Sequence, residues 1–128
     1  MKWFMRKFLW MGILAIFLQA CAPSTVIMKM THQQAIDAMT QDASIVLVDV
    51  RTPQEYASGY VEGAINIPLD TIEDNFENII ASKDTRLFII CRSGNRSAEA
   101  AQILKKLGYT NITDIGGVIN WPQPLVQP

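Results

Sequence analysis

Two apolar runs dominate the hydrophobic pattern of the chain. Residues 44–50 (SIVLVDV) and 85–91 (TRLFIIC) are apolar over most of their length and rich in β-branched side chains. Such runs are typical of strands that are covered on both faces, as in a parallel sheet. Residues 26–28, 63–68 and 110–115 contain shorter apolar stretches that favour further strands. The pattern therefore predicts a sheet built around the two long runs.

Helical spacing of apolar positions lies between the predicted strands. It is clearest over residues 97–107, which end at Gly108, a typical C-terminal stop. Residues 70–80 show the same spacing, and shorter helices are predicted to begin after Thr31 and Thr52, two residues suited to helix N-caps. Because strands and helices alternate, the pattern predicts one α/β domain with a mostly parallel central sheet and helices on both faces.

The first twenty residues have a different character. They begin with basic residues, continue with an apolar stretch over residues 8–18 and end with small residues. This arrangement is typical of a secretory signal peptide, since the apolar stretch is short for a membrane span. An uncleaved membrane anchor is the alternative. Export would place the rest of the chain in an oxidising compartment.

The end of this segment resembles a bacterial lipobox. Residues 18–21 read Leu-Gln-Ala-Cys, and in a lipobox the cysteine is acylated and becomes the mature N-terminus. A competing cut after Ala22 would leave Pro23 first, which that type of signal peptidase is expected to reject. We therefore expect Cys21 to carry lipid and to hold the protein at a membrane. Because Ala22 is not aspartate, the expected position is the outer membrane, facing the periplasm, if the host has two membranes.

These features divide the chain into three parts. We expect residues 1–20 to be a signal peptide, residues 21–25 to be the lipidated N-terminus and a short tether, and residues 26–124 to be the folded domain. Of the 11 basic residues, three lie among the first seven positions, whereas no acidic residue precedes Asp37. The remaining 8 basic and 12 acidic residues make the domain mildly acidic, which argues against nucleic acid as a partner.

Cys91 is the first candidate for chemistry. If Cys21 carries lipid, Cys91 is the only thiol left and cannot form an internal disulfide. An unpaired cysteine in an exported protein is either reactive or buried and inert. The single histidine, His32, lies in a polar stretch and is predicted to be a surface residue, and no spacing in the sequence is typical of a metal site.

The residues after Cys91 favour the reactive alternative. Cys91 ends a predicted central strand, and residues 92–96 form the turn into the next helix, at the edge of a parallel sheet where ligands bind. Main-chain N–H groups at a helix start and nearby guanidinium groups favour thiolate over thiol. Gly94 allows the backbone to close around an anion. The predicted anion-binding residues are Arg92, Ser93, Gly94, Asn95, Arg96 and Ser97.

Three motifs in order resemble the rhodanese-like sulfurtransferase family. Residues 91–97 (CRSGNRS) are similar to its active-site loop, residues 49–69 to its D-x-R…E-[FY]…G-A-x-[NH]-[IV]-P segment, and residues 116–121 (GGVINW) to its closing G-G-x-x-x-W. The resemblance implies a three-layer rhodanese-like fold. Related phosphatases have five residues between cysteine and arginine, whereas this chain has four, as between Cys91 and Arg96.

The resemblance also implies a mechanism without a cofactor. Cys91 would take sulfane sulfur from a small anion such as thiosulfate, and the loop and Arg96 would hold the resulting persulfide for a thiol, cyanide or protein acceptor. Two alternatives stay open: a persulfide carrier with little turnover, and a redox-sensing lipoprotein. Asp49 and Arg51 either border the site or form an ion pair that fixes the neighbouring loop.

Two further positions are interpreted against the family pattern. Tyr60 stands where the family usually has histidine, which puts the local hydrogen bonding in question. Trp121, the last residue of the closing motif, is predicted to be a core residue that closes the domain.

Overall fold

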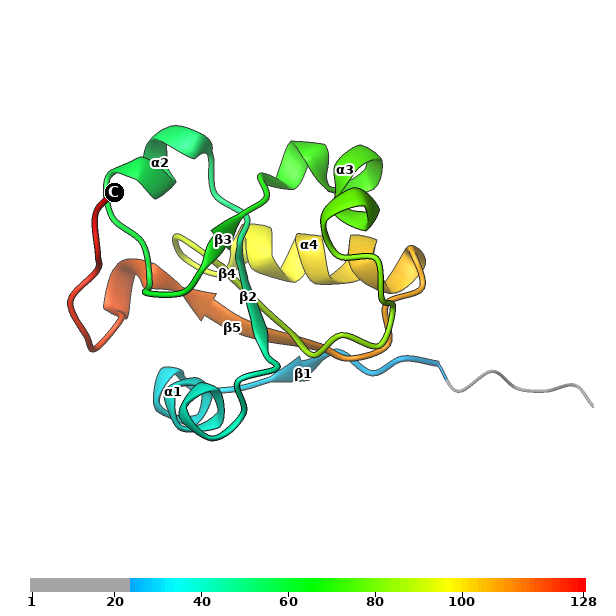
Figure 1. The fold of residues 1–128 in the computed structure, drawn as a ribbon, viewed down its shortest axis with the longest axis horizontal. Helices are drawn as coiled ribbons and strands as arrows, with labels where there is room; N and C mark the ends of the chain where they lie inside the picture. The colour runs from blue at the N-terminus through cyan, green and yellow to red at the C-terminus, as the bar shows by residue number, and fades with distance from the viewer. Residues whose placement is uncertain (1–23) are drawn as a thin grey trace, which may run out of the picture.

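A five-stranded parallel sheet forms the centre of the domain (Figure 1). The computed structural model describes residues 24–128. The strands are β1 (Met28–Lys29), β2 (Val46–Asp49), β3 (Ile65–Asn66), β4 (Leu87–Cys91) and β5 (Ile112–Gly117). Their order across the sheet is β1-β5-β4-β2-β3, and all four neighbouring pairs are parallel. The predicted fold class is confirmed, with β4 in the middle and β2 beside it.

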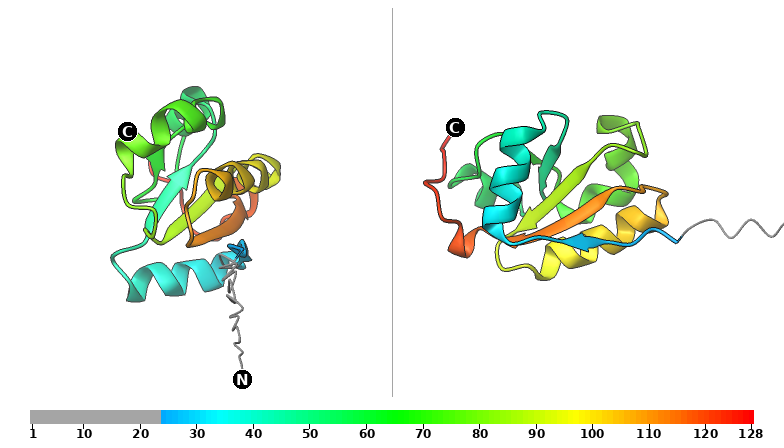
Figure 2. Two further views of the ribbon diagram at one scale, coloured as in Figure 1. Left: turned by 90° about the vertical axis from the view of Figure 1, so that its right-hand side faces the viewer. Right: turned by 90° about the horizontal axis from the view of Figure 1, so that it is seen from below.

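Helices cover both faces of this sheet. They are α1 (His32–Gln41), α2 (Pro53–Ala57), α3 (Ile72–Ile79) and α4 (Asn95–Lys106), with short 3₁₀ helices η1 (Leu69–Thr71) and η2 (Val118–Asn120). Figure 2 shows α1 on one side of the sheet and α3 and α4 on the other, which makes three layers. Among residues 24–128, no helix has the length and apolar character needed to cross a membrane.

The core consists of two apolar clusters, one on each face of the sheet. Side chains alternate along a strand, so Phe88 and Ile90 of β4 pack on the α1 face. Ile89 and Cys91 pack on the opposite face, in the same cluster as residues of α3 and α4. The thiol of Cys91 therefore points toward the layer that contains α4.

Two helices begin with reciprocal side-chain caps. Thr31 and Gln34 form a capping box at the start of α1, and Thr52 and Glu55 form one at the start of α2. Each box satisfies two main-chain N–H groups that have no acceptor inside the helix. Both N-caps agree with the sequence pattern.

The start of α4 differs from the sequence expectation. The helix begins at Asn95, two residues before the predicted start, so the turn from β4 contains only residues 92–94. Gly94 has φ +105°, which favours glycine, and its carbonyl accepts hydrogen bonds from Ala98 N at 3.2 Å and Ser97 Oγ at 3.0 Å. Helical bonding thus starts directly at Gly94.

Candidate active site

Cys91 lies at the carboxyl end of the central strand with 1% of its surface exposed. Its Sγ accepts a hydrogen bond from the main-chain N–H of Gly94 at 2.9 Å. A buried cysteine in an apolar core usually behaves as a small hydrophobic residue. Here the sulfur faces a polar donor at the start of a helix, which stabilises a negative charge on sulfur.

The shape of the loop depends on the neighbouring strand β5. Ile89 of β4 pairs with Asp114, whereas Cys91 pairs with Gly117, so β5 contains one extra residue at this point. This bulge places Gly117 directly against the loop. A Cβ atom on Gly117 would lie only 2.1 Å from the carbonyl oxygen of Arg92 and 2.6 Å from Cα of Ser93. The second glycine of the closing motif is therefore required by the cysteine loop.

Arg96, which was predicted to hold a persulfide, is paired with a carboxylate. Its Nη1 and Nη2 donate hydrogen bonds of 2.7 and 2.9 Å to the two carboxylate oxygens of Glu55. These bonds raise the pKa of Arg96. Arg96 reaches Glu55 because α4 starts early, which places Arg96 in the first helical turn, opposite the start of α2.

Glu55 was not among the predicted site residues. Its Oε1 also accepts hydrogen bonds from N and Oγ1 of Thr52, at 3.2 and 3.1 Å. The hydrogen bonds from Arg96 are the main cause that lowers the pKa of Glu55 from 4.5 to about 2. The capping pattern Thr-x-x-Glu would have identified Glu55 as a helix cap only, because its contact with Arg96 spans 41 residues of sequence.

Asp49 and Arg51 form the ion pair that was one of their two interpretations. Arg51 Nη2 lies 2.7 Å from Asp49 Oδ2, and both residues are almost fully buried. The same Nη2 donates to the carbonyl of Gly59 at 2.8 Å, which ties the end of β2 to the segment after α2. Val50, between the two, lines the cleft described below, whereas Asp49 and Arg51 do not.

The other predicted loop residues have different environments. Arg92, Ser93 and Asn95 are exposed, and the carbonyl of Arg92 accepts a hydrogen bond from Ile119 N at 3.1 Å. Ser97 is fully buried and acts through its bond to the carbonyl of Gly94. Arg92 is therefore the loop guanidinium that faces solvent.

His32 is half-buried rather than a surface residue. Its ring centroid lies 5.1 Å from that of Trp121, and its Nδ1 lies 3.2 Å from the carbonyl oxygen of Asn120. Trp121 packs against the core cluster on the α1 face, as predicted, although it stays partly accessible. His32 thus holds the segment after β5, and with it the close approach of Gly117 to the loop.

Tyr60 is held by contacts of both its ring and its main chain. Its ring stacks on that of Tyr56 with centroids 4.2 Å apart, and its main chain forms two hydrogen bonds with Val126 near the C-terminus.

The described residues do not include the N-terminal segment. The predicted signal peptide, residues 1–20, and the predicted lipidation site, Cys21, therefore lie outside them.

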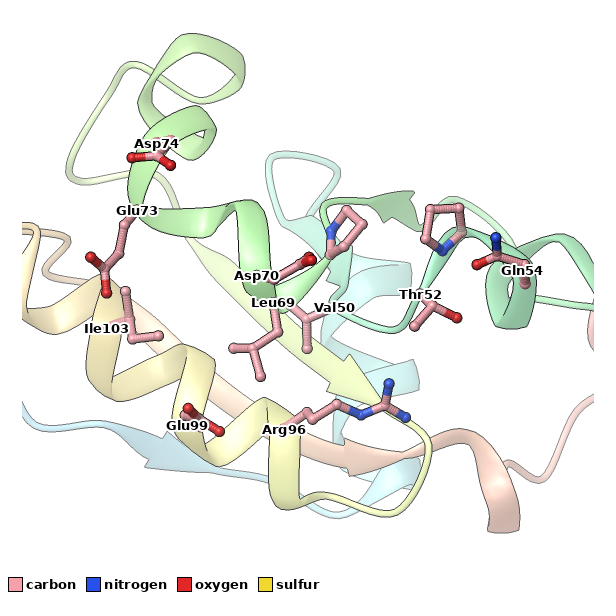
Figure 3. A pocket seen from close by; sticks show the side chains of 12 residues that line it. Val50, Thr52, Gln54, Leu69, Asp70, Glu73, Asp74, Arg96, Glu99 and Ile103 are labelled. Atoms are coloured by element: carbon pink, nitrogen blue, oxygen red, sulfur yellow. The ribbon is translucent and has the colours of Figure 1, made fainter.

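A cleft of about 740 Å³ lies beside the loop, on the same face of the sheet as α3 and α4 (Figure 3). Val50, Leu69 and Ile103 contribute its apolar surface, and Arg96 lies at one end. Cys91 is not part of its wall, but it shares a core cluster with Val50, which is. The cleft therefore lies on the side of Cys91 where Val50 follows the neighbouring strand β2.

Together these features define a class of protein: a parallel α/β domain with a cysteine at the end of its central strand, whose sulfur accepts a main-chain hydrogen bond from the following loop. The family model described as "Rhodanese-like domain" matches residues 31–123. The chain belongs to the rhodanese-like family.

Relatives and solved structures agree with this membership. The chain is 34% identical over 80 residues to "Thiosulfate sulfurtransferase PspE" of Escherichia coli, a match that covers 62% of this chain and 77% of that protein. It is 31% identical over 90 residues to "Putative sulfur carrier protein YrkF" of Bacillus subtilis, with 70% and 46% covered. The crystal structure of a rhodanese-like domain protein from Staphylococcus aureus is similar with a TM-score of 0.71 and 31% identity, and 80% and 99% of the two chains are covered.

The packing of Gly117 predicts a large effect of a single methyl group. We expect Gly117→Ala to displace the loop and to lower the free energy of unfolding by about 3 kcal/mol, as overpacking does. Gly63→Ala is the control, since nothing lies within 4 Å of its added Cβ and only its positive φ adds strain. Urea denaturation measures both variants, and equal losses would contradict the proposed clash.

The contact between Glu55 and Arg96 predicts a pH dependence of stability. A carboxyl with a lowered pKa stabilises the fold at pH values above its unfolded pKa, and this contribution is lost as pH falls through the folded pKa. The difference in free energy of unfolding between wild type and Glu55→Gln should thus be constant above pH 4.5 and shrink between pH 4.5 and about 2. Urea denaturation across this range measures it; a difference that did not change with pH would exclude the ion pair as its source.

Proposed function

We propose that this protein is an exported, lipid-anchored sulfurtransferase that moves sulfane sulfur through a persulfide on Cys91. The observation that carries the proposed sulfur transfer is the hydrogen bond from Gly94 N to Cys91 Sγ at the start of α4, in a protein of the rhodanese-like family. A relative that is named as a thiosulfate sulfurtransferase supports thiosulfate as a donor.

The proposed reaction has two steps, formation of a persulfide and transfer of its outer sulfur. The Cys91 thiolate attacks the outer sulfur of thiosulfate, the bond between the two thiosulfate sulfurs breaks, and sulfite leaves with the electron pair. The outer sulfur of the Cys91 persulfide then bonds to an acceptor such as cyanide, and the thiolate is regenerated as thiocyanate leaves. No proton transfer is needed with these substrates, so a general base is not required.

Main-chain donors are the groups best placed to hold the charge of the persulfide. The guanidinium of Arg96 is already paired with the carboxylate of Glu55, so its charge is largely compensated. We propose that Arg96 and Glu55 position the start of α4, while the amides of the loop stabilise the charge on sulfur. Arg92, which is exposed, attracts an anionic donor to the loop from solvent.

A persulfide carrier with little turnover is the second candidate. The burial of Cys91, with 1% of its surface exposed, would protect a persulfide from small molecules in solution. A relative that is named as a putative sulfur carrier supports this candidate too. Both candidates require a Cys91 persulfide and differ in how the persulfide passes its outer sulfur to an acceptor.

Intact mass spectrometry tests the proposal directly. In a Cys21→Ser background, which leaves Cys91 as the single thiol, thiosulfate should add the mass of one sulfur atom. The matched control, Cys21→Ser with Cys91→Ser, should gain nothing. Release of this sulfur by cyanide as thiocyanate over many cycles identifies a sulfurtransferase, and release without repeated turnover identifies a carrier. A protein that takes no sulfur from thiosulfate or polysulfide would overturn both and favour a redox sensor.

We propose membrane anchoring from the sequence at residues 18–21. In a bacterial host, wild type should incorporate labelled palmitate and run as a shortened mature form. Cys21→Ala should remain a longer precursor without label, because the acylated side chain is missing. Cys91→Ala is the control and should be labelled like wild type. Label that persisted in Cys21→Ala would rule out this lipidation site.

A further inference from the structure

The charge of the cleft beside the loop is opposite to that expected for a site that admits small anions. Four exposed acidic residues line it: Asp70, Glu73, Asp74 and Glu99. Within residues 24–128, none of these four carboxylates forms an ion pair. A small dianion that entered here would meet a repulsive potential.

The basic residues near the loop do not cancel this charge. Arg96 is the single basic residue on the described wall of the cleft, and Glu55 lies within 2.7 Å of it. Arg92 is exposed on the same loop but does not line the cleft, and its carbonyl contacts Ile119 after β5. The loop thus has a basic side chain, Arg92, on its exposed side, and the acidic cleft adjoins it at Arg96.

The dimensions of the cleft fit a short chain segment. One wall is formed by successive turns of α4, through Arg96, Glu99 and Ile103. At a rise of 1.5 Å per residue, the distance along the helix from Arg96 to Ile103 is about 10 Å. Figure 3 shows Asp70 and Glu73 on the opposite wall, which is formed by η1 and the start of α3. An extended peptide covers that length with about three residues. Leu69 and Val50 add apolar surface between the acidic walls.

We propose that this cleft binds a positively charged segment of a protein that exchanges sulfur with Cys91, with lysine or arginine side chains close to the exchanging thiol. The sulfur exchange rests on the proposed function, whereas the binding of a basic segment does not. The carboxylates of both walls pair with the basic side chains, and the apolar surface contacts their aliphatic parts. The segment's thiol then approaches the loop from the end of the cleft that Arg96 occupies.

The binding test uses the full chain with Cys91→Ala, so that no sulfur chemistry takes part. The probes are two fluorescent six-residue peptides with one serine in place of the thiol, one with three lysines and the other with three glutamates. We expect the lysine peptide to bind about tenfold more tightly at low salt, and this ratio to fall as salt shortens the Debye length from about 30 to 8 Å. Equal binding of both peptides, or binding of neither, would overturn the proposal.

Two double variants with the same change in net charge locate the effect. Glu73→Gln with Glu99→Gln removes one carboxylate from each wall and should reduce the preference for the lysine peptide several-fold. Asp37→Asn with Glu62→Gln removes two exposed carboxylates outside the cleft and should leave it unchanged. Circular dichroism establishes that all variants are folded. A similar reduction in both would show a general effect of net charge and contradict the cleft as the site.

A transfer experiment separates this inference from the proposed function. Persulfidated protein in the Cys21→Ser background is mixed with the same two peptides, each now carrying cysteine. Faster transfer to the lysine peptide that is lost with Glu73→Gln and Glu99→Gln supports the inference, since the reactivity of the peptide thiol is the same in both proteins. A rate ratio that this double variant leaves unchanged contradicts it while the sulfurtransferase function stands. If Cys91 takes up no sulfur, the proposed function fails, and the binding of the serine peptides still decides the role of the cleft.

Discussion

The close approach of Gly117 to the backbone of Arg92 and Ser93 is the contact on which the cysteine loop depends. The loop cannot keep its path if any side chain occupies position 117, because a Cβ atom there would overlap the carbonyl of Arg92. The bulge in β5 places Gly117 at this point, and the contacts of His32 with Trp121 and Asn120 hold the segment that follows. The loop that follows β4 is therefore shaped by residues of β5, η2 and α1.

A second constraint acts from the other side of the loop. Glu55 caps α2 and accepts both hydrogen bonds from Arg96, so the starts of α2 and α4 are held together by one carboxylate. This arrangement compensates the charge of Arg96 and leaves the amide of Gly94 as the donor to the sulfur. It also leaves the adjoining cleft dominated by carboxylates. The charge distribution around Cys91 thus depends on Glu55, the cap of α2, as well as on the cysteine loop.

Much of this architecture could be predicted from sequence because local pattern determines it. The apolar runs of β2 and β4 and the caps at Thr31 and Thr52 are properties of consecutive residues. The partner of Arg96 could not be predicted in the same way, since the contact with Glu55 joins two helix starts that are 41 residues apart. The early start of α4 was missed because it depends on the backbone conformation of Gly94, which apolar spacing does not report.

If Cys91 accepts sulfur as proposed, the close packing of Gly117 against the loop is the contact that this uptake requires. The most direct measurement is the amount of sulfite released in a single turnover with thiosulfate, comparing the Cys21→Ser protein with the same protein carrying Gly117→Ala. Both are kept at a temperature where circular dichroism shows them folded. We expect one sulfite for each chain with glycine at position 117 and a much slower, incomplete release with alanine. Equal rates and amounts would contradict the claim and place the origin of reactivity outside this contact.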